Sequence, residues 1–252
     1  MTVLTAVDIE AIERATLQAV APEVVEELPG WLLPMDRGTV GRARSAVPLH
    51  HGLHDTDLLS TIVARYQALR YEPRFRLPDL PSFQSWHEAL NHLGWRREQP
   101  TLTMAGEVHR LLALHTAPPA VLDSQPDAGW MAMFLGEGLD LADGASRSRS
   151  LGRATGTLFA SVREHGQTVA CGAASFGHGW LGVHGMRTAA ARRGEGLAGS
   201  ILHAMASEAR QRGLVSVFLQ VDASNLPALA LYRRAGLSLA WSYDYWRPPL
   251  VN

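Results

Sequence analysis

The chain has 252 residues, of which 46% are hydrophobic and 19% are charged, and its formal net charge is -1. These values suit a globular protein of one or two domains and provide no basic surface for nucleic acid. The one cysteine, Cys171, excludes a disulfide framework and favours a reducing, cytoplasmic location. We expect no signal peptide, because acidic residues interrupt the early apolar positions, and no apolar run reaches the roughly 18 residues of a membrane span. All 23 basic residues are arginine, which excludes a phosphate-loop lysine and a Schiff-base lysine.

The first part of the chain predicts alternating helices and strands. Apolar residues at helical spacing predict a helix over residues 7–28, which Pro29 and Gly30 end. The elements expected after it are strands at 31–34 and 39–47, a helix at 55–69, a strand at 72–77, a helix at 82–93 and a strand at 99–104.

The second part begins with a segment rich in Pro, Ala and Asp at 116–129, where we place a hinge between two halves. We expect a short helix at 130–135, and a mobile segment over a functional site at 140–150, where the residues are small and polar. Further strands are expected at 158–163, 168–175, 180–188 and 219–221, with helices from 197 and from 226. Trp241, Tyr243 and Tyr245 alternate along a last strand, so we expect them to pack on one face.

The order of elements recurs along the chain. Gly94 and Gly236 are 142 residues apart, and at that spacing the later elements of the first half fall opposite those of the second half without a gap. Two copies of one strand–helix–strand–helix–strand unit would explain this, and a coincidence of element lengths is the alternative. The first copy lacks the polar residues of the second, since Leu90 falls opposite Tyr232.

The most informative stretch is Arg193-Gly194-Glu195-Gly196-Leu197-Ala198, where a strand and a short loop lead into a helix. The first N–H groups of a helix have no internal partner, and the helix dipole favours an anion there. Gly194 and Gly196 carry no Cβ, so a ligand can approach the main chain closely. The stretch therefore predicts a pyrophosphate site built from backbone amides.

Two classes of ligand fit such a site. The string Gly194-x-Gly196-x-x-Gly199, with Asp222 further on, matches a dinucleotide fingerprint and would indicate an NAD(P)-dependent oxidoreductase. That fingerprint needs its first glycine directly after a buried strand, whereas a polar and basic loop at 188–193 intervenes here.

The same residues, as Arg193-x-x-Gly196-x-Ala198, resemble the acetyl-CoA signature of the GNAT superfamily of N-acyltransferases. The strand Leu219-Gln220-Val221, followed by Asn225-x-x-Ala228-x-x-Leu231-Tyr232-x-x-x-Gly236-Leu237, resembles the second signature of that superfamily, with Leu237 where Phe is commoner. The resemblance implies an α/β fold with a mixed twisted sheet and helices on both faces. It also implies a tandem protein with two GNAT-like halves, a degenerate domain at 1–108 and a catalytic domain at 109–252.

The resemblance assigns roles to individual residues and implies acetyl-CoA as co-substrate, with no metal. The pyrophosphate falls to Arg193, Gly194, Glu195, Gly196, Leu197 and Ala198. The preceding strand pairs with the pantetheine arm, and one amide among Met186, Arg187 and Thr188 polarises the thioester. Tyr232 corresponds to the general acid for the leaving thiolate, and a packed core tyrosine is the alternative. Asn225 is expected to cap its helix and to contact the cofactor.

The group that accepts the proton of the amine is harder to identify. His184 lies two residues before Met186 on the same strand face, and histidine titrates near neutral pH. The alternatives are His178, Glu137, Asp222 and a chain of water molecules without a dedicated base. His50, His51 and His54 lie in a loop with no matching carboxylate or cysteine set, so we expect no metal site there.

The prediction is therefore transfer of an acetyl group from acetyl-CoA to a primary amine on a small molecule or a peptide. We expect direct attack in a ternary complex, because no cysteine lies in the motifs to carry an acyl group. A non-catalytic acyl-CoA-binding sensor is the first alternative, and the oxidoreductase is the second. No nucleic acid or membrane partner is expected, and the sequence leaves a homodimer open.

Overall fold

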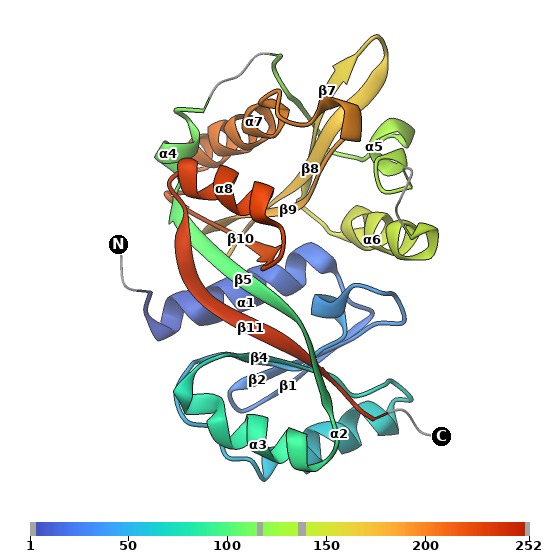
Figure 1. The fold of residues 1–252 in the computed structure, drawn as a ribbon, viewed down its shortest axis with the longest axis vertical. Helices are drawn as coiled ribbons and strands as arrows, with labels where there is room; N and C mark the ends of the chain where they lie inside the picture. The colour runs from blue at the N-terminus through green and yellow to red at the C-terminus, as the bar shows by residue number, and fades with distance from the viewer. Residues whose placement is uncertain (1–3, 115–117, 136–139, 250–252) are drawn as a thin grey trace.

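One twisted sheet of eight strands forms the centre of the molecule, in the order β4-β11-β5-β10-β9-β8-β7-β6 (Figure 1). The structure is a computed structural model that describes residues 4–114, 118–135 and 140–249. Neighbouring strands are antiparallel except β9 and β10, which run parallel, so the predicted mixed sheet is confirmed. The strands are β4 Phe75–Pro78, β5 Arg96–Glu107, β6 Val121–Asp123, β7 Leu158–Glu164, β8 Gln167–Gly177, β9 Trp180–Thr188, β10 Ser216–Asp222 and β11 Ser238–Arg247.

Helices cover both faces of this sheet, as the sequence predicted. An added Cβ at Gly172 of β8 would meet Met205 and Ile201 of α7, whereas the next residue, Ala173, packs with Trp130 of α5. Successive residues of a strand point to opposite faces, so α7 and α5 lie on opposite sides of the sheet. The helices on the α7 side are α4 Val108–Leu111, α7 Leu197–Gln211 and α8 Leu226–Arg234, and those on the other side are α1 Ala6–Val20, α5 Ala128–Ala132 and α6 Leu141–Arg153.

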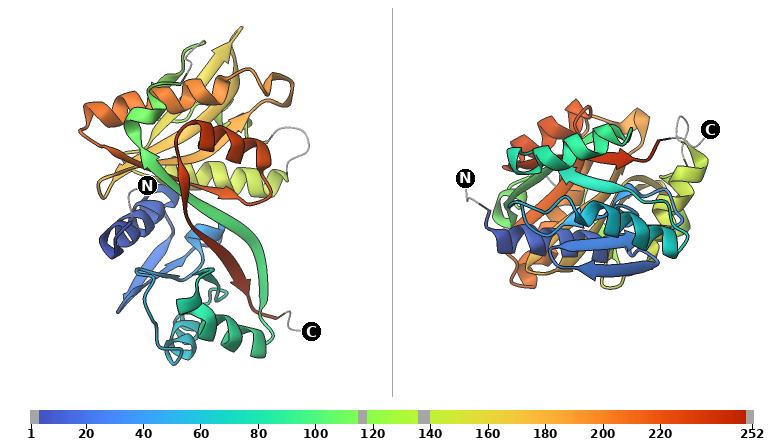
Figure 2. Two further views of the ribbon diagram at one scale, coloured as in Figure 1. Left: turned by 60° about the vertical axis from the view of Figure 1, so that its left-hand side comes forward. Right: turned by 90° about the horizontal axis from the view of Figure 1, so that it is seen from below.

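A second, three-stranded sheet lies in the first part of the chain, with α1 between it and the large sheet (Figure 2). Its strands are β1 Val24–Leu28, β2 Trp31–Met35 and β3 Val47–Pro48, and the 3-10 helix η1 Gly41–Ala43 lies between β2 and β3. The helices α2 Leu58–Ala68 and α3 Gln84–His92, with the 3-10 helix η2 Pro81–Phe83, pack against Trp31, Phe75 and Trp246.

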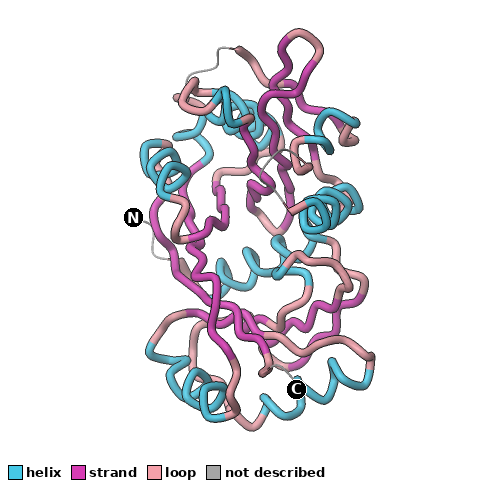
Figure 3. The backbone as a smooth tube through the Cα atoms, turned by 45° about the vertical axis from the view of Figure 1, so that its right-hand side comes forward, coloured by secondary structure: helices cyan, strands magenta, loops and turns pink. Residues whose placement is uncertain are grey.

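The long strands β5 and β11 run side by side from α8 to the α2–α3 end of the molecule (Figure 3). β11 pairs with both β4 and β5, so the last strand of the chain lies between two strands of its first part. Trp241, Tyr243 and Tyr245 pack together against α1, which confirms that they share a face. The boundary between residues 108 and 109 stays a prediction, and one continuous sheet takes strands from both sides of it.

The sequence prediction was wrong for residues 24–28, which form β1 and not the end of a helix. α1 ends at Val20, and Ala21 adopts a left-handed φ of 41° before Pro22. A residue before proline is disfavoured in the helical region, and proline has no N–H to continue the helix. Pro22 was therefore the signal for the helix end, in place of Pro29.

Two further segments differ from the prediction. Residues 39–47 were expected to form a strand, but most of them form a loop around η1, and only Val47 enters β3. Residues 140–150 were expected to be mobile, but they begin α6, with the Asp140 side chain capping it by accepting from the amide of Asp143 at 2.7 Å. The small residues of α6 allow close packing, since an added Cβ at Gly144 would lie 1.9 Å from the carbonyl oxygen of Phe134. The expected hinge region contributes β6 to the sheet edge, and residues 116–117 of that region lie outside the described ranges.

The internal repeat is visible in the elements themselves. The spacing of 142 residues places α3 Gln84–His92 opposite α8 Leu226–Arg234, and the first residue of β5, Arg96, opposite the first of β11, Ser238. β4 falls within β10, and α2 falls within α7. The two halves therefore share one helix–strand–helix–strand order.

Within the described ranges, no helix is long and apolar enough to cross a membrane.

Candidate active site

The parallel strands β9 and β10 diverge at the middle of the sheet. Their pairing ends at Val183 and Leu219, while β9 continues to pair with β8 as far as Thr188. A β-bulge at Gly185 and Met186, opposite Gly172, bends β9 away from β10, and Gly185 takes a φ of 59°. The edge of β9 that faces β10 thus has no strand partner from His184 onward among the described residues. The backbone groups of this free edge are available to a ligand.

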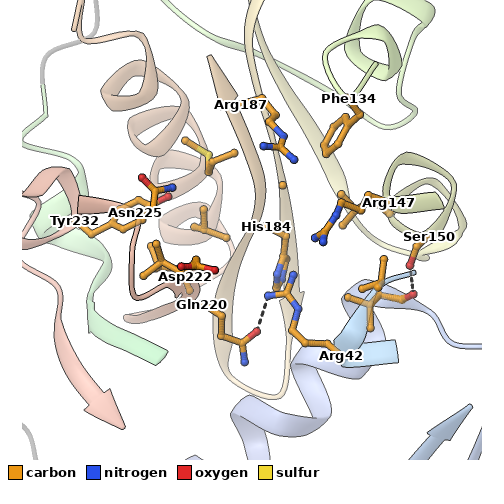
Figure 4. Close-up of a pocket in the computed structure, with 18 residues that line it drawn as sticks. Arg42, Phe134, Arg147, Ser150, His184, Arg187, Gln220, Asp222, Asn225 and Tyr232 are labelled. Atoms are coloured by element: carbon orange, nitrogen blue, oxygen red, sulfur yellow. Dashed lines mark hydrogen bonds between the residues drawn. The ribbon is translucent and has the colours of Figure 1, made fainter. Parts of the chain in front are cut away.

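A cavity of about 210 Å³ occupies this gap (Figure 4). Its walls come from η1 and the end of α1 on one side, α6 on another, and α8 on a third. The lining residues used below are Arg42, Phe134, Arg147, His184, Met186, Arg187, Gln220, Asp222, Asn225 and Tyr232. The cavity therefore brings together predicted site residues of β9 and of the second signature with residues from the first half of the chain.

The glycine-rich stretch forms the predicted helix start, at the end of the loop that follows β9. Gly196 is the N-cap of α7 with a φ of 82°, Gly194 has a φ of 85°, and an added Cβ at either position would meet nothing within 4 Å. Among the described residues, the amides of 194–198 have no hydrogen-bond partner, and the first bonds of the helix come from Gly199 and Ser200. Open space beside unpartnered amides is what a pyrophosphate needs, so these residues fit acetyl-CoA. Thr188 and residues 193–198 do not line the cavity but lie beyond its β9 end.

The dinucleotide fingerprint fits the structure of this stretch less well. The 3-10 helix η3 Ala190–Arg192 separates β9 from Gly194, so the first glycine does not follow the strand in a tight turn. Arg192 of η3 pairs with Glu195 at 2.6 Å and also with Glu164 of β7. These pairs tie the loop to the sheet and occupy the side chain of Glu195, which leaves the main chain as the binding surface.

Tyr232 of α8 reaches the cavity from the α7 side of the sheet. Only 6% of its surface is exposed, and burial raises the pKa of its hydroxyl to about 12. The phenol therefore stays protonated at neutral pH, as a proton donor must. Asn225 caps α8, with its side chain accepting from the amide of Ala228 at 3.2 Å, which confirms the predicted N-cap. Both residues face the gap between β9 and β10 (Figure 4).

His184 lines the cavity from the opposite side of the sheet. Its Nε2 lies 2.9 Å from the hydroxyl of Ser175, and its Nδ1 has no partner among the described residues. Burial, with the nearby Arg42 cation, lowers the pKa of His184 to about 3. An imidazole this hard to protonate is a poor general base at neutral pH, so the structure gives that role little support.

The three other candidates for the base differ in where they lie relative to the cavity. Asp222 lines the cavity at the end of β10 and accepts from the amide and hydroxyl of Ser224 at 2.8 and 2.6 Å. His178 lies in the turn between β8 and β9, at the end of β9 away from the cavity. Glu137 lies outside the described residues. Asp222 is thus the acid that the structure places at the cavity.

Sequence reasoning missed two arginines and a glutamine of the site. Arg42 of η1 donates to the side chain of Gln220 at 2.7 Å, and Arg147 of α6 pairs with Asp143 at 2.6 Å. Neither was predicted as a site residue, because their place depends on how η1 and α6 pack against β9. Arg187 was predicted only through its backbone, but its guanidinium also lies over the ring of Phe134 at 5.3 Å.

The three clustered histidines lie away from this cavity. His50 and His54 stack at 4.1 Å, and His51 packs edge-on against Trp241 at 4.9 Å. Burial lowers the pKa of His51 to about 4, the behaviour of a packed imidazole. No group of three or more metal-ligating side chains occurs in the described parts of the chain.

Comparison with known proteins identifies the family of the chain. The family model described as "Probable histone acetyltransferase Rv0428c C-terminal" matches residues 5–246, and the chain belongs to this family and to the GNAT superfamily of acetyltransferases. A search of curated proteins found no match.

Solved structures show the same fold at low identity. A GCN5-related N-acetyltransferase from Kribbella flavida is 17% identical, with 96% of each chain covered and a TM-score of 0.69. One from Sphaerobacter thermophilus is 18% identical, with 99% of this chain and 96% of that chain covered and a TM-score of 0.57. A tandem GNAT protein from the clavulanic acid biosynthesis pathway is 13% identical, with coverages of 99% and 98% and a TM-score of 0.59. The last comparison agrees with the internal repeat described above.

Proposed function

We propose that the chain is an N-acetyltransferase that moves an acetyl group from acetyl-CoA to the nitrogen of a primary amine. The observation that carries this proposal is one gap in the sheet with three features around it. These are the unpartnered amides of 194–198, the unpaired edge of β9 and the hydroxyl of Tyr232. The family's description supports the same reaction class.

Two of these features would bind acetyl-CoA. The amides at the start of α7 would hold the pyrophosphate, with the exposed Arg193 beside them. The free edge of β9 at Met186 and Arg187 would hydrogen-bond the pantetheine arm as an added strand does. An N–H of the same edge would stabilise the negative charge that develops on the carbonyl oxygen.

Acetyl-CoA, when bound, supplies a thioester whose carbonyl carbon the amine nitrogen can attack. A C–N bond forms and the C–S bond breaks, and the electron pair of that bond leaves on sulfur. Tyr232 holds the proton that the thiolate takes up, and water returns a proton to the phenolate. The substrate ammonium loses two protons in all, of which one reaches the thiol by way of Tyr232 and one goes to solvent. Direct attack in a ternary complex remains our proposal, since Cys171 is buried and its thiol pKa is raised to about 12 by burial.

We propose that Asp222, in place of His184, accepts the first proton that the substrate ammonium loses, either directly or through water. Its carboxylate stands at the cavity on the same sheet face as Gln220, where an ammonium would be attracted. A water chain without a dedicated base stays the alternative. His184 would instead pack the cavity wall as a neutral imidazole.

A sensor that binds acyl-CoA without turnover is the alternative function. It would keep the amide cradle, that is, the unpartnered amides of 194–198, but it would not need a protonated Tyr232 in the gap. The description of the matching family names a histone acetyltransferase, and a basic peptide is therefore one of the acceptors to test. A cytoplasmic location and a homodimer stay predictions.

Thermal unfolding with acetyl-CoA, CoA and NAD(H) in separate samples tests the proposal. A ligand at about 100 times its Kd adds roughly 2.7 kcal/mol to the stability of the domain that binds it. For a chain of this size, that corresponds to on the order of 5–10 °C if unfolding is cooperative. We expect a shift with acetyl-CoA and CoA and none with NAD(H). A shift with NAD(H) alone would overturn the assignment of the glycines.

A further inference from the structure

Three arginines surround the cavity on one side of the sheet: Arg42 of η1, Arg147 of α6 and Arg187 of β9. Figure 4 shows the Arg42 and Arg147 guanidinium groups directed toward His184, with Arg187 further along β9. Among the described lining residues, Asp222 is the one acid that faces them. The lining therefore carries three cationic side chains against one acid, with Asp143 paired to Arg147, although the whole chain has a net charge of -1.

These arginines are not placed to bind the pyrophosphate. An added Cβ at Gly185 would meet Leu151 of α6 and Phe134, and Arg187 lies over the same Phe134 ring. Both contacts lie on the α5–α6 face of the sheet, whereas the amide cradle begins α7 on the other face. The cationic side of the cavity is thus the side from which the acceptor would enter.

Two of the arginines have no ion-pair partner among the described residues, because the acids near them, Asp143 and Glu13, pair with Arg147 and Arg76 instead. Arg147 has Asp143 as a partner, but Arg42 has only the neutral Gln220, and Arg187 has no carboxylate within 4.0 Å among the described residues. The Nε of Arg187 is buried without a hydrogen-bond partner. Burial and the neighbouring Arg147 lower the pKa of Arg187, so its charge is held at a cost. A guanidinium left in this state is a ready partner for an oxyanion, which it can bind with two parallel hydrogen bonds.

We propose that the acceptor is a small amine that also carries a carboxylate, as a free amino acid does, and this inference rests on the proposed function. Its carboxylate would lie against Arg42 and Arg187, and its ammonium would lie toward Asp222 and the thioester. The same guanidinium groups would repel a lysine-rich peptide, because like charges at an interface are costly. The first half of the chain, through Arg42, then takes part in acceptor recognition.

The test compares matched acceptors by thiol release from acetyl-CoA. The common L-amino acids, their C-terminal amides and a lysine-rich peptide are assayed with the full chain and with Arg42→Gln and Arg187→Gln. Arg149→Gln is the control, because Arg149 lies on α6 two residues from Arg147 but is exposed and does not line the cavity. Thermal shift with CoA is measured for every variant, so that a loss of folding or of the cofactor site is recognised.

We expect at least one amino acid to be acetylated with a kcat/KM about tenfold to a hundredfold above that of its amide, the range of one charge-assisted hydrogen bond. Arg42→Gln and Arg187→Gln should reduce this preference mainly through KM, while Arg149→Gln should keep it. Equal or better turnover of amides or of the peptide would overturn the inference and leave the acetyltransferase standing. So would failure of every amino acid while CoA still stabilises the chain. Absence of any CoA shift would instead overturn the proposed function itself.

Discussion

Replacing Gly196 with alanine separates the cost of backbone strain from the cost of a blocked cradle. Gly196 and Gly213 lie at the two ends of α7 with φ values of 82° and 76°, and an added Cβ would meet nothing within 4 Å at either position. Placing an L-residue in this left-handed region costs roughly 1–2 kcal/mol. For a chain of this length, each kcal/mol lowers Tm by about 2–4 °C. Gly196→Ala and Gly213→Ala should therefore lose similar stability, about 2–8 °C.

Binding of acetyl-CoA should distinguish the two variants. A Cβ at Gly196 stands beside the unpartnered amides and would remove at least one charge-assisted hydrogen bond to phosphate, about 1.5–3 kcal/mol. Isothermal titration should then show a Kd raised roughly tenfold or more for Gly196→Ala and an unchanged Kd for Gly213→Ala. Equal affinities in the two variants, with equal losses of Tm, would refute the cradle.

Three other predictions follow from the contacts around the site. Tyr232→Phe should lower kcat roughly 10²-fold in a thiol-release assay and leave the Kd for acetyl-CoA near that of the wild type, so an unchanged kcat would end its role as general acid. The pKa of His184 is about 3 in the folded chain, whereas its ordinary value is 6.5. Between these two pH values the unfolded state binds more protons than the folded state, so the free energy of unfolding falls as the pH falls. His184→Asn should remove up to about 1.4 kcal/mol per pH unit from that slope in urea titrations between pH 7 and 5, and identical slopes would contradict the burial of His184. Glu13→Ala should cost about 3–5 kcal/mol in the same titrations, because it leaves Arg76, only 1% exposed, without its 2.5 Å partner, and a loss below 1 kcal/mol would mean that the pair is hydrated.

The sequence predicted the elements that carry the motifs better than the segments between them. Asn225 was recognised because a helix cap and a signature coincide at one residue, and α8 begins where it was expected. The glycines at 194 and 196 were recognised because backbone conformation alone demands them. Local rules suffice in both cases, since the interacting groups are close in sequence.

The misses have a different physical origin. α6 was taken for a mobile segment because its residues are small and polar, yet Gly144 is what lets the helix approach the carbonyl of Phe134. Arg42 was not predicted at the site, and its place at the cavity is fixed by a hydrogen bond to Gln220, 178 residues later in the chain. His184 was expected to titrate near neutral pH, and only its burial beside Ser175 reveals otherwise. Contacts between distant segments set these properties, and periodicity in one sequence does not report them.

A crystal structure of the chain with bound CoA would test the central claim most directly. The account predicts the pyrophosphate on the amides of 194–198 and the pantetheine along the free edge of β9. It also predicts the thiol beside the hydroxyl of Tyr232, in the cavity between β9 and β10. CoA bound elsewhere on the chain, or density that leaves this gap empty at saturating CoA, would contradict it.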